Sequence, residues 1–377
     1  MPGVIRKFTK QFIVLCNVLV SSCMLLVYVL PKSNQAYFWF INLFALTFPF
    51  LVLIQIGFLV FWLLAKRKLT LIPIITLLLC IPLIQKIIAV NGTAKQTAEP
   101  GFKIATWNVH LLNFYERGGN HDEQMIQKAK ELNAGVLAVQ ELVFSLDSNS
   151  YMSLDSLKAK LGFKYAVAGN DRSFGVHTNG GRRNERYFPF CVALFSNYPV
   201  LQWKKVQPVP QYNHTFIWAD LLVGSDTIRC FVVHMQSMHF VKTDYDFIDN
   251  INDQDVENVK RVGRTLINKM KNANVLRAIQ AHNIKEEVNK SPYPVILCGD
   301  FNDVPNSYAY QTIGKGLKDA HLEKGNGIGR TFQYLSPTLR IDYIWHSPSL
   351  VLQSTHVVRP SLSDHCPVTA SFVLPLK

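Results

Sequence analysis

Three long uncharged stretches near the beginning of the chain restrict its fold more than any other feature. They run over residues 12–30, 33–65 and 69–85, and each is rich in Leu, Ile, Val and Phe. An apolar run of about 18 residues is long enough to cross a hydrocarbon layer roughly 30 Å thick as a helix. The third run is shorter, but Lys86 could reach the interface and extend the apolar segment to residue 90.

These runs predict an all-α transmembrane region of about three helices over residues 1–90. The expected spans are residues 12–30, 37–64 and 69–90. A cleaved signal peptide would explain the first run alone but not three in succession. Two spans with one segment lying in the membrane interface are the alternative arrangement. The small polar residues 91–101 indicate a linker to the rest of the chain.

The net charge of +13 is concentrated beside the apolar runs. Residues 1–98 contain nine Lys or Arg and no acidic residue, which leaves 30 basic and 26 acidic side chains in the rest of the chain. Basic flanks mark the cytoplasmic side of membrane helices. They precede the first run and separate the second from the third, so an integral membrane protein with three spans would place residues 102–377 on the extracytoplasmic side. The weak charge of that region does not predict a nucleic-acid surface.

Residues 102–377 have the pattern of an α/β domain. Short runs rich in β-branched residues predict strands, and two longer stretches predict helices between them. The expected strands are Lys103–Asn108, Val136–Gln140, Val192–Ser196, Thr227–His234, Val295–Cys298, Ile341–Trp345 and Val368–Val373. The expected helices are Asp122–Leu132 and Asp255–Val288. Strands mixed with helices in this way favour a layered α/β sandwich.

The cysteines give no sign of a zinc site. Three of the seven lie in the uncharged runs, and the other four are widely spaced without a CxxC or Cys/His pattern. Those four are Cys191, Cys230, Cys298 and Cys366. Their apolar surroundings favour buried free thiols, and a disulfide between two of them is the alternative.

Polar residues stand at the ends of the apolar strands, one after another. They are Asn108 (in TWN), Glu141 (in QE), His234, Asp300 and Asn302 (in GDFN), Asp342 (in RIDYI), and Asp364 and His365 (in SDH). Carboxylates are costly beside buried strands unless they are paired or bind a cation. Oxygen ligands suit Mg²⁺, and Asn and His donors stabilise charge on phosphoryl oxygens. Each motif alone is a common turn or surface feature, but the set predicts a metal-dependent phosphate site.

The ordered set resembles the endonuclease/exonuclease/phosphatase superfamily, which includes abasic-site endonucleases, pancreatic-type deoxyribonucleases, neutral sphingomyelinases and inositol polyphosphate 5-phosphatases. The resemblance covers residues 102–377 and does not extend to residues 1–98. It implies a four-layer α/β/β/α sandwich, in which two packed sheets are flanked by helices. It also implies hydrolysis of phosphate esters with Mg²⁺, or with Mn²⁺ as the alternative.

The resemblance also implies a role for each residue of the set. The implied metal ligands are Glu141, Asn108 and Asp364. The implied catalytic residues are Asp300, Asn302, His365, Asp342 and His234. Asp300 would orient or deprotonate the attacking water, and His365, held by Asp342, would stabilise the transition state. Asn302 and His234 would contact the phosphate.

A second basic feature lies in the glycine-rich segment GGRRNER. Its arginines are Arg182, Arg183 and Arg186. Guanidinium groups bind phosphate well, so these residues are candidates for substrate binding. A solvated basic loop is the alternative.

The expected function is that of a membrane-embedded phosphodiesterase of the nuclease type, with nucleic acid as its substrate. A phospholipid or sphingomyelin-type phosphodiesterase, or a phosphatase of small phosphate esters, is the alternative, because tethering raises the local concentration of lipid head groups. A catalytically inactive, membrane-tethered binding module is the third hypothesis. No protein partner is predicted.

Overall fold

The computed structural model describes residues 2–92, 101–113, 121–146, 152–177, 185–207, 216–238, 247 and 256–373. The chain divides into two compact units. The helical unit contains Met1–Ile88, Phe240–Ala278 and Asp303–Gln311, and the sandwich unit contains Ala89–His239, Ile279–Asn302 and Thr312–Lys377. Two segments from the second half of the chain therefore belong to the helical unit. The sequence analysis did not anticipate them there.

Two long apolar helices form the main part of the helical unit. They are α1 (Pro2–Leu26) and α3 (Ile41–Ala65), joined by η1 (Val27–Lys32) and α2 (Gln35–Phe38). The candidate membrane spans are Val4–Leu30 and Ile41–Ala65, by length and composition alone. Many of their Leu, Val, Ile and Phe side chains are exposed.

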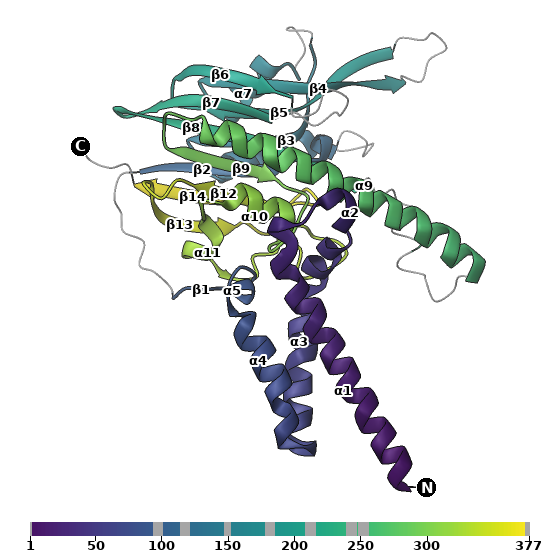
Figure 1. The fold of residues 1–377 in the computed structure, drawn as a ribbon. Helices are drawn as coiled ribbons and strands as arrows, with labels where there is room; N and C mark the ends of the chain where they lie inside the picture. The colour runs from purple at the N-terminus through teal and green to yellow at the C-terminus, as the bar shows by residue number, and fades with distance from the viewer. Residues whose placement is uncertain are drawn as a thin grey trace. The chain divides into compact units, whose positions relative to one another are not determined.

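The prediction of about three long helices is wrong in its count. The third apolar run forms η2 (Arg67–Thr70), α4 (Leu71–Leu79) and α5 (Ile81–Ile84) instead of one long helix. Pro82 lies in the first turn of α5. Proline has no amide hydrogen for the carbonyl four residues earlier, so the helix is interrupted beside Cys80. In Figure 1, α4 nevertheless runs beside α1 and α3, and the three pack together.

A buried polar network joins these three helices. The amide of Asn17 donates to Gln55 Oε1 at 3.0 Å, and the amide of Gln55 donates to Ser21 Oγ at 2.9 Å. Thr76 of α4 donates to the same Ser21 oxygen at 2.9 Å, and Trp62 donates to Asn17 Oδ1 at 3.2 Å. Hydrogen bonds between these buried polar side chains hold the helices in one register, because a buried polar group without a partner lowers the free energy of unfolding.

Two six-stranded sheets make up the sandwich unit. The first has the order β13 (Val351–Val357), β14 (Val368–Val373), β2 (Gly101–Asn108), β3 (Val136–Val143), β5 (Glu185–Ser196), β4 (Tyr165–His177). The second has the order β10 (Lys318–Asp319), β12 (Asp342–His346), β9 (Val295–Asp300), β8 (Asp226–His234), β7 (Phe216–Val223), β6 (Val200–Val206). A short pair, β1 (Ala89–Val90) and β11 (Asn326–Gly327), lies apart from both.

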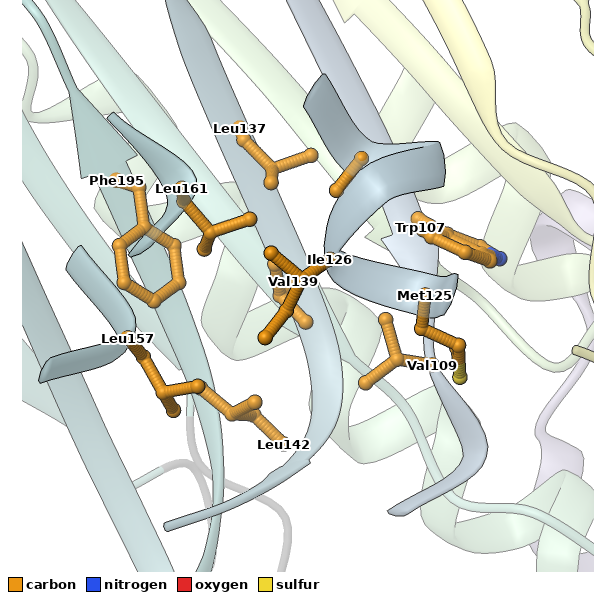
Figure 2. A pocket seen from close by; sticks show the side chains of 11 residues that line it. Trp107, Val109, Met125, Ile126, Leu137, Val139, Leu142, Leu157, Leu161 and Phe195 are labelled. Carbon is orange, nitrogen blue, oxygen red and sulfur yellow. The ribbon is translucent and has the colours of Figure 1, made fainter. Parts of the chain in front are cut away.

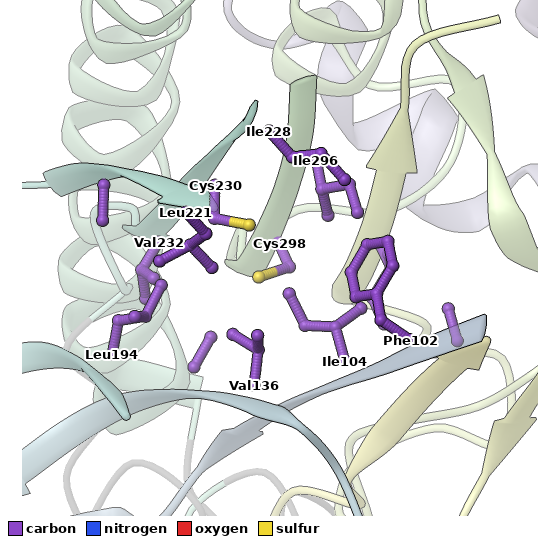
Figure 3. Packing of buried hydrophobic residues seen from close by; sticks show 14 of the residues in the cluster. Phe102, Ile104, Val136, Leu194, Leu221, Ile228, Cys230, Val232, Ile296 and Cys298 are labelled. Atoms are coloured by element: carbon purple, nitrogen blue, oxygen red, sulfur yellow. The ribbon is translucent and has the colours of Figure 1, made fainter. Parts of the chain in front are cut away.

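The two sheets pack face to face through an apolar core. Figure 3 shows Phe102 and Ile104 of the first sheet against Ile296 and Cys298 of the second. The next residue, Ala105, points to the opposite face, as the two-residue period of a strand requires. Strands buried on both faces carry near-continuous apolar runs, which is why the sequence shows them so clearly.

Helices cover the outer faces of both sheets, so the predicted α/β/β/α sandwich is confirmed. Helices α6 (His121–Glu131) and α7 (Leu154–Leu161) cover the first sheet. The last part of α9 (Val256–Asn289) covers the second, where Lys204 of β6 lies 3.8 Å from Glu287. Beneath α6 and α7 is a wholly apolar cavity of about 20 Å³ (Figure 2).

Strand direction decides where the functional residues meet. Strands β2 and β3 are parallel, with Asn108 opposite Gln140, and β8 and β9 are parallel, with His234 opposite Asp300. Strand β12 runs antiparallel to β9 and begins with Asp342 opposite Asp300. The carboxyl ends of four strands and the start of a fifth therefore lie at one end of the sandwich. All seven predicted strands overlap observed ones.

Candidate active site

The side chain of Asn108 connects the two sheets. It ends β2 in the first sheet, and its amide nitrogen donates to Asp300 Oδ2 of the second sheet at 3.0 Å. The same nitrogen lies 3.2 Å from Glu141 Oε1. Only 1% of Asn108 is exposed. One amide group thus brings two carboxylates from different sheets together.

A bulge in β3 directs Glu141 towards this centre. The pairing of β3 with β5 shifts between Val139 and Leu142, and Glu141 has φ 54°. A bulge inserts an extra residue and turns its side chain out of the regular alternation. His234 Nε2 lies 3.5 Å from Glu141 Oε1 and 3.9 Å from Asp300 Oδ2. His234 therefore faces both carboxylates.

His365 and Asp342 form a buried pair on the other side of Asp300. His365 Nδ1 lies 2.9 Å from Asp342 Oδ2, and its Nε2 lies 3.8 Å from Asp300 Oδ2. The ring of Phe332 meets the imidazole edge-on with centroids 5.0 Å apart. Burial lowers the pKa of His365, but the neighbouring Asp342 and Asp300 outweigh it and leave that pKa well above its ordinary value.

The carboxyl groups of Asp300 and Glu141 are hard to ionise in this setting. Burial raises the pKa of Asp300 to about 7, against the effect of His365, and Asp342 adds to the rise. Burial also raises the pKa of Glu141, although the amide of Asn108 opposes it. In the described part of the chain, no lysine or arginine pairs with either carboxylate. Buried carboxyl groups of this kind are stabilised by a bound cation or by protonation.

The donors present suit a divalent metal ion. Glu141, Asn108 and Asp364 offer oxygen atoms, the ligands that Mg²⁺ and Mn²⁺ prefer. The side chains of Glu141 and Asp364 are 22% and 20% exposed, so both are accessible from solvent. A second group, Asp300, Asp342 and His365, has ligand atoms within 4.8 Å of one another. The 2.9 Å contact of His365 with Asp342 favours proton transfer over metal binding for that group.

Asn302 lies beside Asp300 in a strained turn. Its φ is 51°, and its backbone N–H donates to Asp300 Oδ1 at 2.7 Å. Its side-chain amide donates to the carbonyl of Met235 at 3.0 Å. These bonds fix the orientation of the GDFN turn.

Ser363 and Trp107 support the loop that carries Asp364 and His365. Ser363 Oγ donates to the carbonyl of Asn108 at 2.8 Å and accepts from the backbone N–H of His365. Trp107 donates to the carbonyl of His365 at 3.0 Å. The motifs TWN and SDH therefore include their own supporting residues, whose roles the sequence analysis missed.

His110 is a further residue of the site that the sequence analysis missed. Its Nδ1 lies 3.7 Å from Asp364 Oδ1, its backbone N–H donates to Asn108 Oδ1 at 3.0 Å, and its φ is 43°. Its place two residues after Asn108 was the available signal. The arginine cluster remains a prediction, since Arg182 and Arg183 lie outside the described residues and only the backbone of Arg186, in β5, is described.

Comparison with known families gives two matches. A model described as "Endonuclease/Exonuclease/phosphatase family" matches residues 105–365, and one for a domain of unknown function matches residues 10–87. A curated relative, the "CCR4-Not complex 3'-5'-exoribonuclease subunit Ccr4" of Saccharomyces cerevisiae, is 39% identical over 62 residues. That match spans 16% of this chain and only 7% of the relative.

Solved structures share the fold of the sandwich unit. An endonuclease/exonuclease/phosphatase from Beutenbergia cavernae has a TM-score of 0.52 and 16% identity, over 73% of this chain and 72% of its own. The human Nocturnin catalytic domain has a TM-score of 0.51 and 15% identity, over 72% and 93%. The mannosyl-6-phosphatase of Bacteroides thetaiotaomicron has a TM-score of 0.51 and 16% identity, over 72% and 100%.

Proposed function

The chain belongs to the endonuclease/exonuclease/phosphatase family, and from this premise we propose that it is a membrane-anchored phosphodiesterase that depends on a divalent metal ion. Hydrolysis of phosphate esters is the common activity of the family. The observation that carries the proposal is the amide of Asn108, which lies 3.2 Å from Glu141 and 3.0 Å from Asp300. It sets a candidate metal ligand beside a candidate base.

Each residue has a role in this proposal. Glu141, Asn108 and Asp364 hold the cation, which when bound polarises the phosphoryl oxygens and offsets charge on the leaving oxygen. Asp300 accepts a proton from the attacking water, a task for which a pKa near 7 is suited. His365, protonated at Nε2, donates to a phosphoryl oxygen as negative charge develops there.

The remaining polar groups of the site orient His365 and the substrate phosphate. Asp342 holds Nδ1 of His365 at 2.9 Å, which leaves Nε2 directed towards Asp300 and the substrate. His234 lies 3.9 Å and Asn302 3.1 Å from Asp300 Oδ2, and both contact the phosphate in this proposal. Asp342 is 3% exposed, so the orientation of the imidazole does not depend on solvent.

The membrane anchor consists of α1, α3 and the helical turns between Arg67 and Ile88. The third crossing in this proposal is the apolar run of residues 69–90, which begins after the basic residues 66–68 and is interrupted beside Cys80. Thr76 supports this arrangement because it hydrogen-bonds to Ser21 of α1 inside the bundle. An odd number of crossings, with basic residues on the cytoplasmic side, puts the sandwich unit outside the cytoplasm.

Nucleic acid is the leading substrate, and a phospholipid or small phosphate ester is the second candidate. The second is favoured by the anchor and by the weak net charge after residue 98. The test is a substrate panel on the full chain in detergent micelles. It includes plasmid DNA, single-stranded DNA, RNA, sphingomyelin vesicles and bis(p-nitrophenyl) phosphate, each with Mg²⁺ and with a chelator.

The outcomes of the panel separate the candidates. Degradation of polynucleotides alone supports the nuclease, and head-group release from vesicles alone supports the lipid phosphodiesterase. Turnover must disappear with the chelator and in Asp300→Asn. No turnover of any substrate by the wild-type protein leaves the inactive binding module as the better account.

A further inference from the structure

We propose that Thr331 is a positioning residue of the active site, which fixes the backbone of the His365–Asp342 pair. This inference rests on the proposed hydrolysis, in which Asp300 accepts a proton from water. Thr331 and these three residues all belong to the sandwich unit. Thr331 is fully buried, so it acts only through the groups that surround it.

The hydroxyl of Thr331 accepts two consecutive backbone N–H groups of the RIDYI motif. Its Oγ1 lies 3.0 Å from the nitrogen of Ile341 and 3.1 Å from that of Asp342. Strand β12 begins at Asp342. A buried N–H group without an acceptor is costly, because it has lost its water and gained no partner. One oxygen atom therefore fixes the start of β12, and with it the position from which the Asp342 carboxylate meets His365.

The backbone of Thr331 holds the loop that carries His365. The N–H of Cys366 donates to the carbonyl of Thr331 at 2.8 Å, and Phe332 forms a β-bridge with His365. The ring of Phe332 also meets the imidazole edge-on. Thr331 thus bonds to the backbone on both sides of the contact between His365 Nδ1 and Asp342 Oδ2, which measures 2.9 Å.

A single peptide group connects Thr331 to the neighbour of Asp300. The peptide between Ile341 and Asp342 donates its N–H to Thr331 Oγ1, and its carbonyl accepts the N–H of Phe301 at 2.9 Å. Asp342 also stands opposite Asp300 in the pairing of β12 with β9. Hydrogen bonds made through one peptide group strengthen each other. The hydroxyl of Thr331 therefore supports the backbone of the proposed base as well as that of the pair.

Thr331 should affect the rate more than the binding of substrate. Its burial keeps it away from the phosphate, and among the described hydrogen bonds its hydroxyl joins only the N–H groups of Ile341 and Asp342. A displacement of about 1 Å at a catalytic group is enough to lower a rate about a hundredfold. Loss of the acceptor should displace Asp342, and through it the imidazole of His365, without removing a group that binds phosphate.

The test compares Thr331→Val and Thr331→Ser in the full chain, in detergent micelles, with bis(p-nitrophenyl) phosphate and Mg²⁺. Valine has nearly the shape of threonine but no oxygen. Thr331→Val is therefore expected to lower kcat about ten- to a hundredfold, with KM changed less than about twofold. Serine keeps the acceptor, so Thr331→Ser should retain kcat within about threefold of the wild-type value.

Thr355→Val is the matched control. Thr355 is also a buried threonine of the sandwich unit, but its hydroxyl donates to the carbonyl of Thr369 at 2.9 Å. The variant should lower the melting temperature and leave kcat at the wild-type value. Should Thr331→Val fail to fold, Thr331→Cys replaces it, because a thiol is a much weaker acceptor in a similar volume. Its kcat should fall below that of Thr331→Ser.

Amide hydrogen exchange provides the second readout. In Thr331→Val or Thr331→Cys, the amides of Ile341 and Asp342 should exchange at least about tenfold faster than in Thr355→Val, while those of β7 stay protected. Wild-type kcat in the variants that lack the hydroxyl, or an equal loss of kcat in Thr355→Val, overturns the inference. If the wild-type protein turns over no phosphate ester, the proposed function fails. Unchanged exchange at Ile341 and Asp342 then overturns the inference separately.

Discussion

Asp300 is the residue on which the most contacts of the site converge. Asn108 and Asn302 donate to it, and His234 and His365 lie within 4 Å of the same oxygen, Oδ2. A buried carboxylate with so many donors is held in a single orientation. Its proton affinity is nevertheless raised, because burial outweighs the hydrogen bonds. Rigidity together with a pKa near neutrality is what a general base requires.

Removal of the side-chain function of Asp300 or of His365 should nearly abolish turnover. We expect Asp300→Asn and His365→Ala each to lower kcat by at least a hundredfold with little change in thermal unfolding, as steady-state kinetics and melting curves will measure. His356→Ala is the control for the histidine, because His356 is exposed on β13. Wild-type rates in both variants would contradict the assigned roles.

The pH dependence of kcat should have two limbs. Asp300 must be ionised, so the rate rises with pH through about 7. His365 must be protonated, and since its pKa is raised well above the ordinary value, the rate falls only in the alkaline range. Asp342→Asn removes the largest favourable influence on the imidazolium, so the alkaline limb should move to lower pH. An alkaline limb that stays in place in this variant argues against protonated His365 as the hydrogen-bond donor to the phosphoryl oxygen.

At the scale of elements, α7 depends on a small number of apolar contacts. Leu157 is 1% exposed and lines the cavity of about 20 Å³ beneath α6 and α7 (Figure 2). Leu157→Ala would enlarge a space that already lacks atoms, and such changes cost about 2–5 kcal/mol. We expect that loss in the free energy of unfolding, measured with denaturant. Leu146→Ala, at a position 67% exposed, should change it little.

Most strands that were predicted from sequence are buried on both faces, although β7 is equally buried and was missed. Strands β2, β3, β8 and β9 are apolar on both faces, and each ends in polar residues that converge on one site. Strands β6 and β13 were not predicted, because most of their residues are not buried and their sequences show no continuous apolar run. His110 was also missed, although it lies two residues after Asn108, because its approach to Asp364 depends on a backbone φ of 43°.

The helical unit shows which structural features the hydropathy of the sequence cannot predict. Uncharged runs predicted α1 and α3, but they carried no information on the break beside Cys80, which depends on Pro82. Nor did the uncharged runs indicate that the side chain of Asn42 hydrogen-bonds to that of Asn274. Contacts between residues more than 200 positions apart leave no local periodicity, so only the folded chain reveals them.

For the whole molecule, the proposed topology makes a direct prediction. Protease added to intact cells should digest the sandwich unit, because three crossings with cytoplasmic basic flanks leave it outside. An epitope inserted between Lys66 and Lys68 should stay protected until the membrane is permeabilised. Immunoblots of both fragments provide the measurement. Protection of the sandwich unit together with exposure of the epitope would require the opposite orientation.

The order of strands in the first sheet has a consequence for biosynthesis. Strand β14 is the last strand described, yet it inserts between β13 and β2, the first long strand of the sandwich unit. The loop before β14 supplies Asp364 and His365. While the chain is still being made, β2 lacks this neighbour, and Asp300 and Asp342 lack the imidazole of His365. A nascent chain should therefore be inert towards the cell's own phosphate esters until translation has passed residue 373.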